Sequence, residues 1–316
     1  MAKTSIEWTD ETWNPVTGCT KVSEGCRNCY AERIASRFWG ERKFDQVMCH
    51  AERLDAPLRW RKPRKVFVCS MGDLFHPQVP FGYIEEVFNV MVKASQHIFQ
   101  VLTKRAVDMR TFVLHYQERK GIDLSLVDNI WLGVSCESQP EASTRIPVLI
   151  NTPAAIHFIS CEPLLGGIWL NETENDNNFG TGKAWIGNMD YPTLDWVIVG
   201  GESGPMARPT HPNWALSLRY QCKAHQVPFF FKNWGEWGIV GTNIDREGHV
   251  INRLYPVMSD GEWYLENGAI MRRIGMVKER RELDGRLWEE FPTLRVFKES
   301  CLSGQKVYVS YAYPSI

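Results

Sequence analysis

Short apolar runs recur along most of the chain, and longer amphipathic stretches separate them. The runs are rich in β-branched and aromatic residues and show little polar alternation, as in strands covered on both faces. They lie at 65–70, 97–103, 129–135, 155–160, 195–201 and 227–232, and a first strand is predicted near 11–16. Between them, 83–95, 105–119 and 213–225 have helical spacing. This alternation of strand and helix predicts an α/β fold of parallel βα units.

The number of predicted strands favours a partial TIM-like (βα) barrel, and a doubly wound open sheet is the alternative. In both folds, ligands bind beyond the carboxyl ends of the strands. We expect the barrel at 1–237, with an insertion near 171–190 that is rich in Asn, Gly and Asp. We expect residues 238–316 to form a small C-terminal extension of hairpin-like pieces, with turn signals at Asp260-Gly261 and Asn267-Gly268.

Composition narrows the function classes. The 316 residues are 44% hydrophobic and 23% charged, which excludes a disordered chain. The 36 Lys and Arg against 37 Asp and Glu give a net charge of -1, which argues against a protein that neutralises a long DNA backbone. A single nucleotide or a short nucleic-acid segment fits this balance. The N-terminus has no apolar signal region and no apolar run spans a membrane, so we expect a cytoplasmic protein without a membrane partner.

Three of the nine cysteines form a motif between the first strand and a helical segment from Ala31 onward. Cys19, Cys26 and Cys29 have the spacing C-x6-C-x2-C on a loop rich in Gly, Thr and Ser. Three thiolates on one loop can converge on a metal centre, and the loop glycines permit close backbone approach. The residues alone leave two centres open: zinc with a fourth ligand such as His50, or a 4Fe-4S cluster with one iron free of protein sulfur.

Polar residues follow each predicted strand. The endings read SMGD (70–73), TKR (103–105), SCES (135–138), SCEP (160–163), GGES (200–203) and KNWGEW (232–237). Because the carboxyl ends of parallel strands meet at one edge, we expect these side chains to line one site. Each also has an ordinary structural interpretation: Asp73 as a helix cap, Lys104 and Arg105 as a solvated pair, the glycines as a turn and the tryptophans as packing.

Several segments together resemble one family. They include IEWTDETWNPVTGCTKVSEGCRNCYAE, SMGDLFHPQVP, FQVLTKR, TPAAIHFISCEPLLG and VPFFFKNWGEW, and with further matches they span Ile6 to Pro292. The chain resembles the radical S-adenosylmethionine (radical SAM)-like proteins of phages and prophages that carry a three-cysteine motif, a family of unknown function. The cysteine loop and TKR are more distantly similar to spore photoproduct lyase. The usual radical SAM spacing is C-x3-C-x2-C, so the first gap here is three residues wider.

The resemblance implies a partial barrel of the radical SAM type with two cofactors. Cys19, Cys26 and Cys29 would bind a 4Fe-4S cluster, and S-adenosyl-L-methionine (SAM) would complete the open iron. The residues that would contact SAM are Ser70, Asp73, Lys104, Ser135, Glu162, Gly200, Gly201 and Glu202. Those that would contact substrate are Arg105, Arg208, Lys232 and Trp234, with His211 and Arg286 as secondary phosphate contacts.

The function that follows is an enzyme that uses the cluster and SAM to generate a 5'-deoxyadenosyl radical. Because the family is found in phages, we expect a nucleotide or DNA-base substrate, and specifically an isomerase that rearranges a modified thymidine in phage DNA hypermodification. An external one-electron reductase would be a partner, and the host cytoplasm the location. Two alternatives are a DNA-repair lyase of the spore photoproduct lyase kind and a non-catalytic, zinc-stabilised nucleic-acid-binding module.

Overall fold

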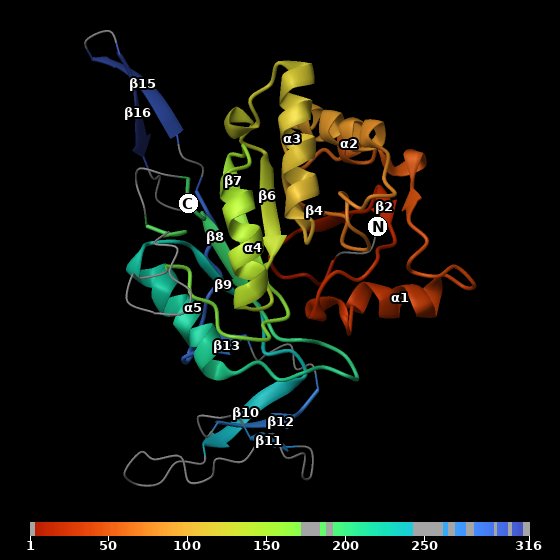
Figure 1. Ribbon diagram of the computed structural model, residues 1–316, viewed down its shortest axis with the longest axis vertical. Coiled ribbons are helices and arrows are strands. Elements are labelled where there is room, and N and C mark those ends of the chain that lie inside the picture. Colours follow the sequence, from red (N-terminus) through yellow and green to blue (C-terminus); the bar gives the residue numbers. More distant parts are fainter. Residues whose placement is uncertain are drawn as a thin grey trace.

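A computed structural model describes residues 4–171, 184–187, 192–242, 262–264, 269–275, 281–293, 296–302 and 305–311. Its centre is a seven-stranded parallel sheet that curls into a half-barrel (Figure 1). Sheet order follows chain order, as the right-handed βα crossovers of a barrel require. The strands are β1 (Glu11–Trp13), β4 (Lys65–Val68), β5 (Ile98–Thr103), β6 (Ile130–Ser135), β7 (Ile156–Cys161), β8 (Trp196–Val199) and β9 (Phe229–Phe231).

Helices cover the outer face of this sheet (Figure 1). They are α2 (Phe81–Lys93), α3 (Ala106–Lys120), α4 (Gln139–Ile150) and α5 (Pro212–Ala224). Local sequence sets their ends: α3 stops at Gly121, whose φ of 64° is left-handed, and α5 starts with proline at its first turn. Apolar side chains of the helices and of the outward-facing strand positions form the larger core, which includes Phe88, Phe112 and Tyr116.

A second core of mostly aromatic side chains fills the concave face of the half-barrel. Its buried members are Trp8, Phe67, Trp131, Ile156, Phe158, Trp196, Ile198 and Phe230. Trp8 comes from the N-terminal segment, which is fixed where the Asp10 backbone N–H donates to the Lys65 carbonyl oxygen at 2.9 Å. The Lys65 backbone N–H donates in turn to Asp10 Oδ2 at 2.7 Å. The N-terminal segment therefore lies inside the curl of the sheet.

The predicted strands are confirmed to within a few residues. The seven-stranded half-barrel sheet is compatible with the predicted partial (βα) barrel. The predicted first strand is two elements, β1 and β2 (Val16–Thr17), and β2 pairs antiparallel with β3 (Met48–Cys49). Helix α4 has no counterpart in the prediction, because Pro140 and Pro147 lie within it. Single 3-10 turns complete the barrel region at η1 (Glu24–Cys26), η2 (Ala51–Arg53), η3 (Pro57–Arg59) and η4 (Leu124–Leu126).

Short antiparallel pairs follow the barrel. They are β10 (Trp237–Thr242) with β12 (Ala269–Arg273) and β11 (Glu262–Tyr264), then β13 (Glu282–Leu283) with β14 (Arg286–Leu287), and β15 (Val296–Leu302) with β16 (Gln305–Tyr311). Both predicted turns, Asp260-Gly261 and Asn267-Gly268, lie outside the described residues, as does most of the predicted insertion at 171–190. The division of the chain at residue 237 stays a prediction.

The segment 281–291 returns to the barrel and packs on its last strand. The backbone N–H of Phe231 donates to the Trp288 carbonyl oxygen at 2.9 Å, and Trp196 Nε1 donates to that of Glu290 at 2.8 Å. Phe291 contacts Trp196 and Phe230 with ring centroids 5.2 and 5.5 Å apart. This part of the C-terminal region therefore covers the edge of the sheet.

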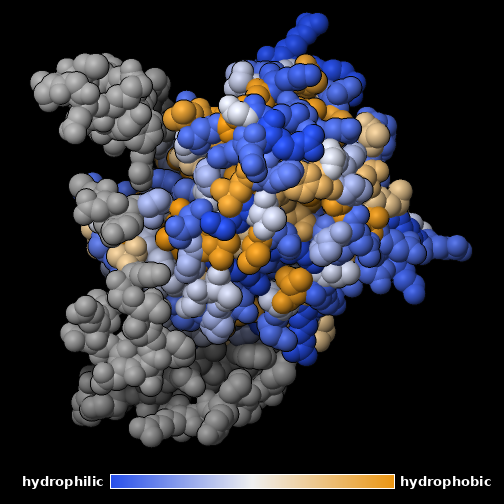
Figure 2. Space-filling model, turned by 45° about the horizontal axis from the view of Figure 1, so that its top comes forward, coloured by the Kyte–Doolittle hydropathy of each residue, from blue (hydrophilic) through white to orange (hydrophobic). Residues whose placement is uncertain are grey.

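The described surface mixes polar and apolar residues. On the face in Figure 2, hydrophobic residues occur in small groups among hydrophilic ones. Among the helices of the described ranges, none has both the length and the apolar character needed to cross a membrane.

Candidate functional site

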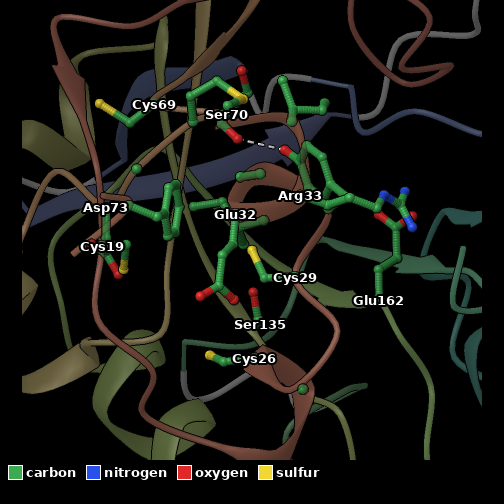
Figure 3. A pocket seen from close by; sticks show the side chains of 18 of the residues that line it. Cys19, Cys26, Cys29, Glu32, Arg33, Cys69, Ser70, Asp73, Ser135 and Glu162 are labelled. Atoms are coloured by element: carbon green, nitrogen blue, oxygen red, sulfur yellow. Dashed lines mark hydrogen bonds between the residues drawn. The ribbon is translucent and has the colours of Figure 1, made fainter. Parts of the chain in front are cut away.

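A cavity of about 1250 Å³ lies at the carboxyl ends of the strands, where the cysteine loop (residues 18–29) covers them. All three thiols of the motif line it, and Figure 3 shows Cys19, Cys26 and Cys29 around the same space. Most of the predicted cofactor and substrate contacts also line it: Ser70, Asp73, Lys104, Arg105, Ser135, Glu162, Gly201, Glu202 and Lys232. Residues at the carboxyl ends of several strands therefore line one cavity, together with the cysteine loop.

Glycines let the cysteine loop lie close to the strand ends. Gly18 has φ of 94°, and its N–H donates to the Met71 carbonyl oxygen at 2.9 Å. Gly25, in the turn η1, packs on the side chain of Glu137, and a Cβ there would overlap that carboxylate. The loop ends where α1 (Tyr30–Phe38) begins, directly after Cys29. The sequence Gly-Cys at both 18–19 and 25–26 thus has a steric reason.

Arg105 holds the loop near its first cysteine. Its Nη1 donates to Cys19 Sγ at 3.5 Å and to Asp73 Oδ2 at 3.0 Å. Its Nη2 donates to the carbonyl and hydroxyl oxygens of Thr20, both at 3.1 Å. Arg105 is only 9% exposed to solvent. Both terminal nitrogens of this predicted substrate contact therefore already have acceptors within the protein.

Asp73 also has several hydrogen-bond donors within the protein. Its carboxylate accepts from Thr103 Oγ1 at 2.7 and 2.9 Å in addition to Arg105, and from the Phe75 backbone N–H at 3.0 Å. Helix α2 begins only at Phe81, so Asp73 caps a local turn and not a helix. The carboxylate predicted to receive the SAM amino group thus orients Arg105.

Glu137 holds the loop near its second cysteine. It is 1% exposed, and it accepts from Ser23 Oγ at 2.9 Å and from Arg145 Nη1 at 2.9 Å. The ammonium of Lys104 forms an ion pair with the same carboxylate. Two cations therefore share one buried anion directly behind Cys26.

Glu202 holds the end of the loop. It accepts from Arg208 Nη2 at 2.7 Å and from Asn28 Nδ2 at 3.1 Å. Arg208 Nη2 also donates to the Glu24 carbonyl oxygen at 3.0 Å. Burial alone would raise the pKa of Glu202, but these hydrogen bonds outweigh it and the pKa lies below its ordinary value. Arg105, Glu137 and Glu202 thus each hold part of the cysteine loop. We call the loop together with these three residues and their bonding partners the clamped side of the cavity.

The three thiols differ in acidity. Burial, followed by the charge of Asp73, raises the pKa of Cys19 to about 11, and burial also raises the pKa of Cys29. At Cys26 burial is outweighed by the charge of Lys104 and by hydrogen bonds from backbone groups, so the pKa is lowered. Ligation by a metal requires thiolates, so binding would release protons from the other two. Among the described residues, no three His, Cys, Asp or Glu side chains lie close enough together to hold one metal ion.

The opposite wall is built from the ends of β7 and β9 and from the N-terminal segment. Glu162 Oε1 forms an ion pair with Lys232 Nζ at 2.9 Å, and Oε2 accepts from Trp8 Nε1 at 3.2 Å. Gly200 does not line the cavity, but a Cβ there would lie 2.8 Å from Glu162 Oε1, so this glycine makes room for the carboxylate. Glu7 lines the cavity beside this pair and interacts with the charge of Lys232. We call Glu7, Glu162 and Lys232 the open side.

Besides Gly200, four predicted contacts lie outside the cavity lining. Arg208 binds Glu202 and the loop from outside, as described above. Trp234 is buried, and its Nε1 donates to the Glu282 carbonyl oxygen at 3.0 Å. His211 accepts from the Asn213 backbone N–H at the start of α5. Arg286 is exposed and lies over the ring of Trp288.

Sequence reasoning missed several lining residues. Glu7 and Trp8 precede the first predicted strand, and no pattern marks them except the motif IEW within the family resemblance. Cys69, which lies outside the three-cysteine motif, lines the cavity with φ of 61°, and burial raises its pKa. Cys136, directly after β6, and Cys161, the last residue of β7, are fully buried in the larger core and do not line the cavity.

The chain belongs to the family described as "Protein of unknown function (DUF5131)", which matches residues 3–292. Comparison with curated proteins and with solved structures gave no match.

Proposed function

From the cysteine loop and the cavity that it covers, we propose that the protein is a radical SAM enzyme. The observation that carries the proposal is that three thiols from one loop line a single large cavity at the carboxyl edge of a parallel half-barrel. The resemblance in the sequence to radical-SAM-like phage proteins supports the same chemistry.

The donor set suits a 4Fe-4S cluster held by Cys19, Cys26 and Cys29. Each thiolate would ligate a different iron, so the sulfurs need a wider arrangement than the ligands of one ion do. When bound, the cluster and SAM supply a 5'-deoxyadenosyl radical. The residues of the chain provide the setting: Lys104 offsets negative charge at Cys26, and Arg105 donates a hydrogen bond to the Cys19 sulfur. Hydrogen bonds to sulfur and nearby charge set the reduction potential of such clusters.

Seven of the eight predicted SAM contacts line the cavity and divide into two groups, whereas Gly200 lies outside the lining. Ser70, Ser135, Gly201 and Glu162 line the cavity, and we propose them as direct contacts. Asp73, Lys104 and Glu202 already bond to Arg105, Glu137 and Arg208, so we propose that they act chiefly by fixing the loop.

For the substrate, we propose a nucleobase in phage DNA, with rearrangement of a substituted thymidine as the reaction. The cavity has room for SAM and a nucleotide together, and the neutral charge balance suits one nucleotide better than a long duplex. A base in duplex DNA would have to be flipped out to reach the strand ends. An external reductase would supply the electron.

Anaerobic reconstitution with iron and sulfide tests the proposal. Wild-type protein is expected to become brown and to produce 5'-deoxyadenosine from SAM and dithionite. Cys26→Ala is expected to abolish both signals. Cys49→Ala is the matched control, because Cys49 is half-buried in β3 and lies outside the cavity lining. A wild-type protein that stays colourless, or that holds only zinc, contradicts the proposal.

A further inference from the structure

The cations that line the cavity fall into two classes. Four of them have an acidic side chain in contact: Lys21 with Glu32, Lys104 with Glu137, Arg105 with Asp73 and Lys232 with Glu162. The other three, Arg33, Arg42 and Lys43, form no ion pair with any residue that the structure describes. They come from α1 and from the turn that follows it, and we call them the basic rim.

The basic rim lies at the solvent side of the cavity. Arg33 and Lys43 are exposed, and Figure 3 shows Arg33 among the side chains around the cavity. The paired cations Lys104 and Arg105 are shielded from solvent, with side chains 18% and 7% exposed. Positive charge without an acidic partner is therefore found at the entrance, whereas the cations farther inside are already neutralised.

Uncharged partners hold the rim in place without neutralising it. Arg33 Nη1 donates to the Ser203 carbonyl oxygen at 3.1 Å, and a Cβ on Gly204 would overlap this guanidinium. The guanidinium of Arg42 lies over the ring of Trp39, 4.1 Å from its centroid. A carbonyl oxygen and an aromatic face orient a guanidinium but leave its charge available. The rim is thus positioned in advance for an anion, which lowers the cost of binding one.

The local charge balance differs from that of the whole chain. Residues 33–45 carry four Lys or Arg and two acids, Glu41 and Asp45, although the net charge of the chain is -1. Arg33 and Arg37 are one turn apart on α1, and like charges at this spacing slightly destabilise a helix. The stability of α1 therefore gives no reason for this pair, and an anionic partner does.

We propose that the basic rim binds phosphates of a single DNA strand whose base enters the cavity. Given the proposed function, on which this inference rests, the base would lie against the apolar wall that Trp8, Phe67 and Leu102 provide. The phosphates next to it would stay at the entrance, where an arginine binds phosphate bidentately and a lysine as a point charge. A few contacts of this kind agree with a protein that binds a short segment of strand.

Fluorescence anisotropy with a short fluorescein-labelled single-stranded oligothymidylate measures this binding, and thymidine 5'-monophosphate is the competitor that has one phosphate. Wild-type protein is expected to bind the oligonucleotide about tenfold or more tightly than the mononucleotide. The double variant Arg33→Gln/Lys43→Gln is expected to lose about tenfold in oligonucleotide affinity at low salt. Its plot of log affinity against log salt should become shallower by about 1.4, since each phosphate contact on a single strand contributes about 0.7.

Arg61→Gln/Lys62→Gln is the matched control, because it removes the same charge from two exposed residues between η3 and β4 that lie outside the cavity lining. It is expected to bind the oligonucleotide as wild type does. Equal weakening by both double variants would show general attraction by charge, and weakening by neither would show that the strand does not contact the rim. Either result overturns the inference, as does an oligonucleotide that binds no more tightly than the mononucleotide.

Lys43→Gln alone separates a binding effect from misfolding, since the Lys43 side chain has no hydrogen bond or ion pair in the described part of the chain. This variant is expected to keep the melting temperature of wild type and to lose about threefold in oligonucleotide affinity. Wild-type affinity in Lys43→Gln, with binding lost only in a double variant that has also lost thermal stability, would contradict the inference.

An acidic electron donor is the other kind of partner that a basic surface fits. Unchanged oligonucleotide binding in the rim variant, together with slower reduction of the cluster by an acidic flavoprotein, would assign the rim to that donor and overturn the inference. The anisotropy titration uses neither SAM nor reductant, and it is made on the protein both as purified and after reconstitution. Failure to form 5'-deoxyadenosine therefore counts only against the proposed function, and absence of the rim effect counts only against this inference.

Discussion

The carboxylates on the two sides of the cavity differ in the partners that they have within the protein. On the clamped side, Asp73, Glu137 and Glu202 each bond to several donors, and these bonds hold the cysteine loop. On the open side, Glu162 likewise accepts from Lys232, Trp8 and Ser160, but Glu7 Oε2 is buried without a donor in the described part of the chain. The difference teaches that side chains of the protein hold the cysteine loop in place, whereas one carboxylate oxygen on the other side, Glu7 Oε2, has no donor in the described part of the chain.

The largest effect is expected from Glu137→Gln. Removing this charge leaves Lys104 and Arg145 buried without their shared anion, and breaking such a pair costs about 3–5 kcal/mol of unfolding free energy. Urea denaturation measures the change. A loss below about 1 kcal/mol would mean that the cations find other partners and that the clamp is dispensable.

Arg105→Lys is expected to cost about 1.5–3 kcal/mol, the range for hydrogen bonds to charged groups. Lysine keeps the charge beside Asp73 but cannot reach Cys19, Thr20 and Asp73 together, because it lacks the planar fork. Denaturation and the iron content after reconstitution are the measurements. Arg119→Lys is the control, since the Arg119 side chain is 55% exposed where it pairs with Glu85. Equal behaviour of the two variants would show that the fork geometry is unimportant.

Glu202→Gln is expected to cost about 1 kcal/mol at neutral pH, because the amide can still accept one hydrogen bond. The pKa of Glu202 is lowered in the folded protein, so its charge stabilises the fold above the ordinary value of 4.5. That contribution is lost as the pH falls through the lowered pKa. The difference between wild type and variant should therefore be full at pH 6 and shrink well below pH 4.5. A difference that is constant with pH would contradict the ion pair.

Glu7→Gln is expected to leave the unfolding free energy within about 0.5 kcal/mol of wild type, since no bond to a described residue is lost. The same substitution thus has opposite consequences at Glu137 and at Glu7, and parallel urea titrations of the two variants compare them directly. A loss above about 2 kcal/mol at Glu7 would place it with the clamped carboxylates.

Much of the fold could be predicted from the sequence because its strands are buried on both faces. Continuous apolar runs mark such strands, as at 129–135 and 155–160, where every residue of β6 and β7 is buried. Helix α4 could not be predicted, since Pro140 and Pro147 obscure its pattern, although Pro140 lies in the first turn and is tolerated there.

The position of the site could be predicted, but the partners of its charged groups could not. Parallel topology alone brings the strand ends to the thiols. Whether Asp73 faces a ligand or Arg105, however, depends on side-chain directions that strand periodicity does not encode. The contact of Gly25 with Glu137 joins residues more than one hundred positions apart in the sequence. The charge interaction of Glu7 with Lys232 joins residues that are still farther apart.

The packing of 281–291 on β9 has a practical consequence for anyone who shortens the chain. Ending it at residue 237, where the barrel was predicted to finish, would uncover the rings of Trp196 and Phe230 and the unpaired edge of β9. Exposed strand edges with aromatic neighbours recruit other chains. Such a truncated protein is expected to aggregate on expression, and the smallest useful fragment extends through Phe291.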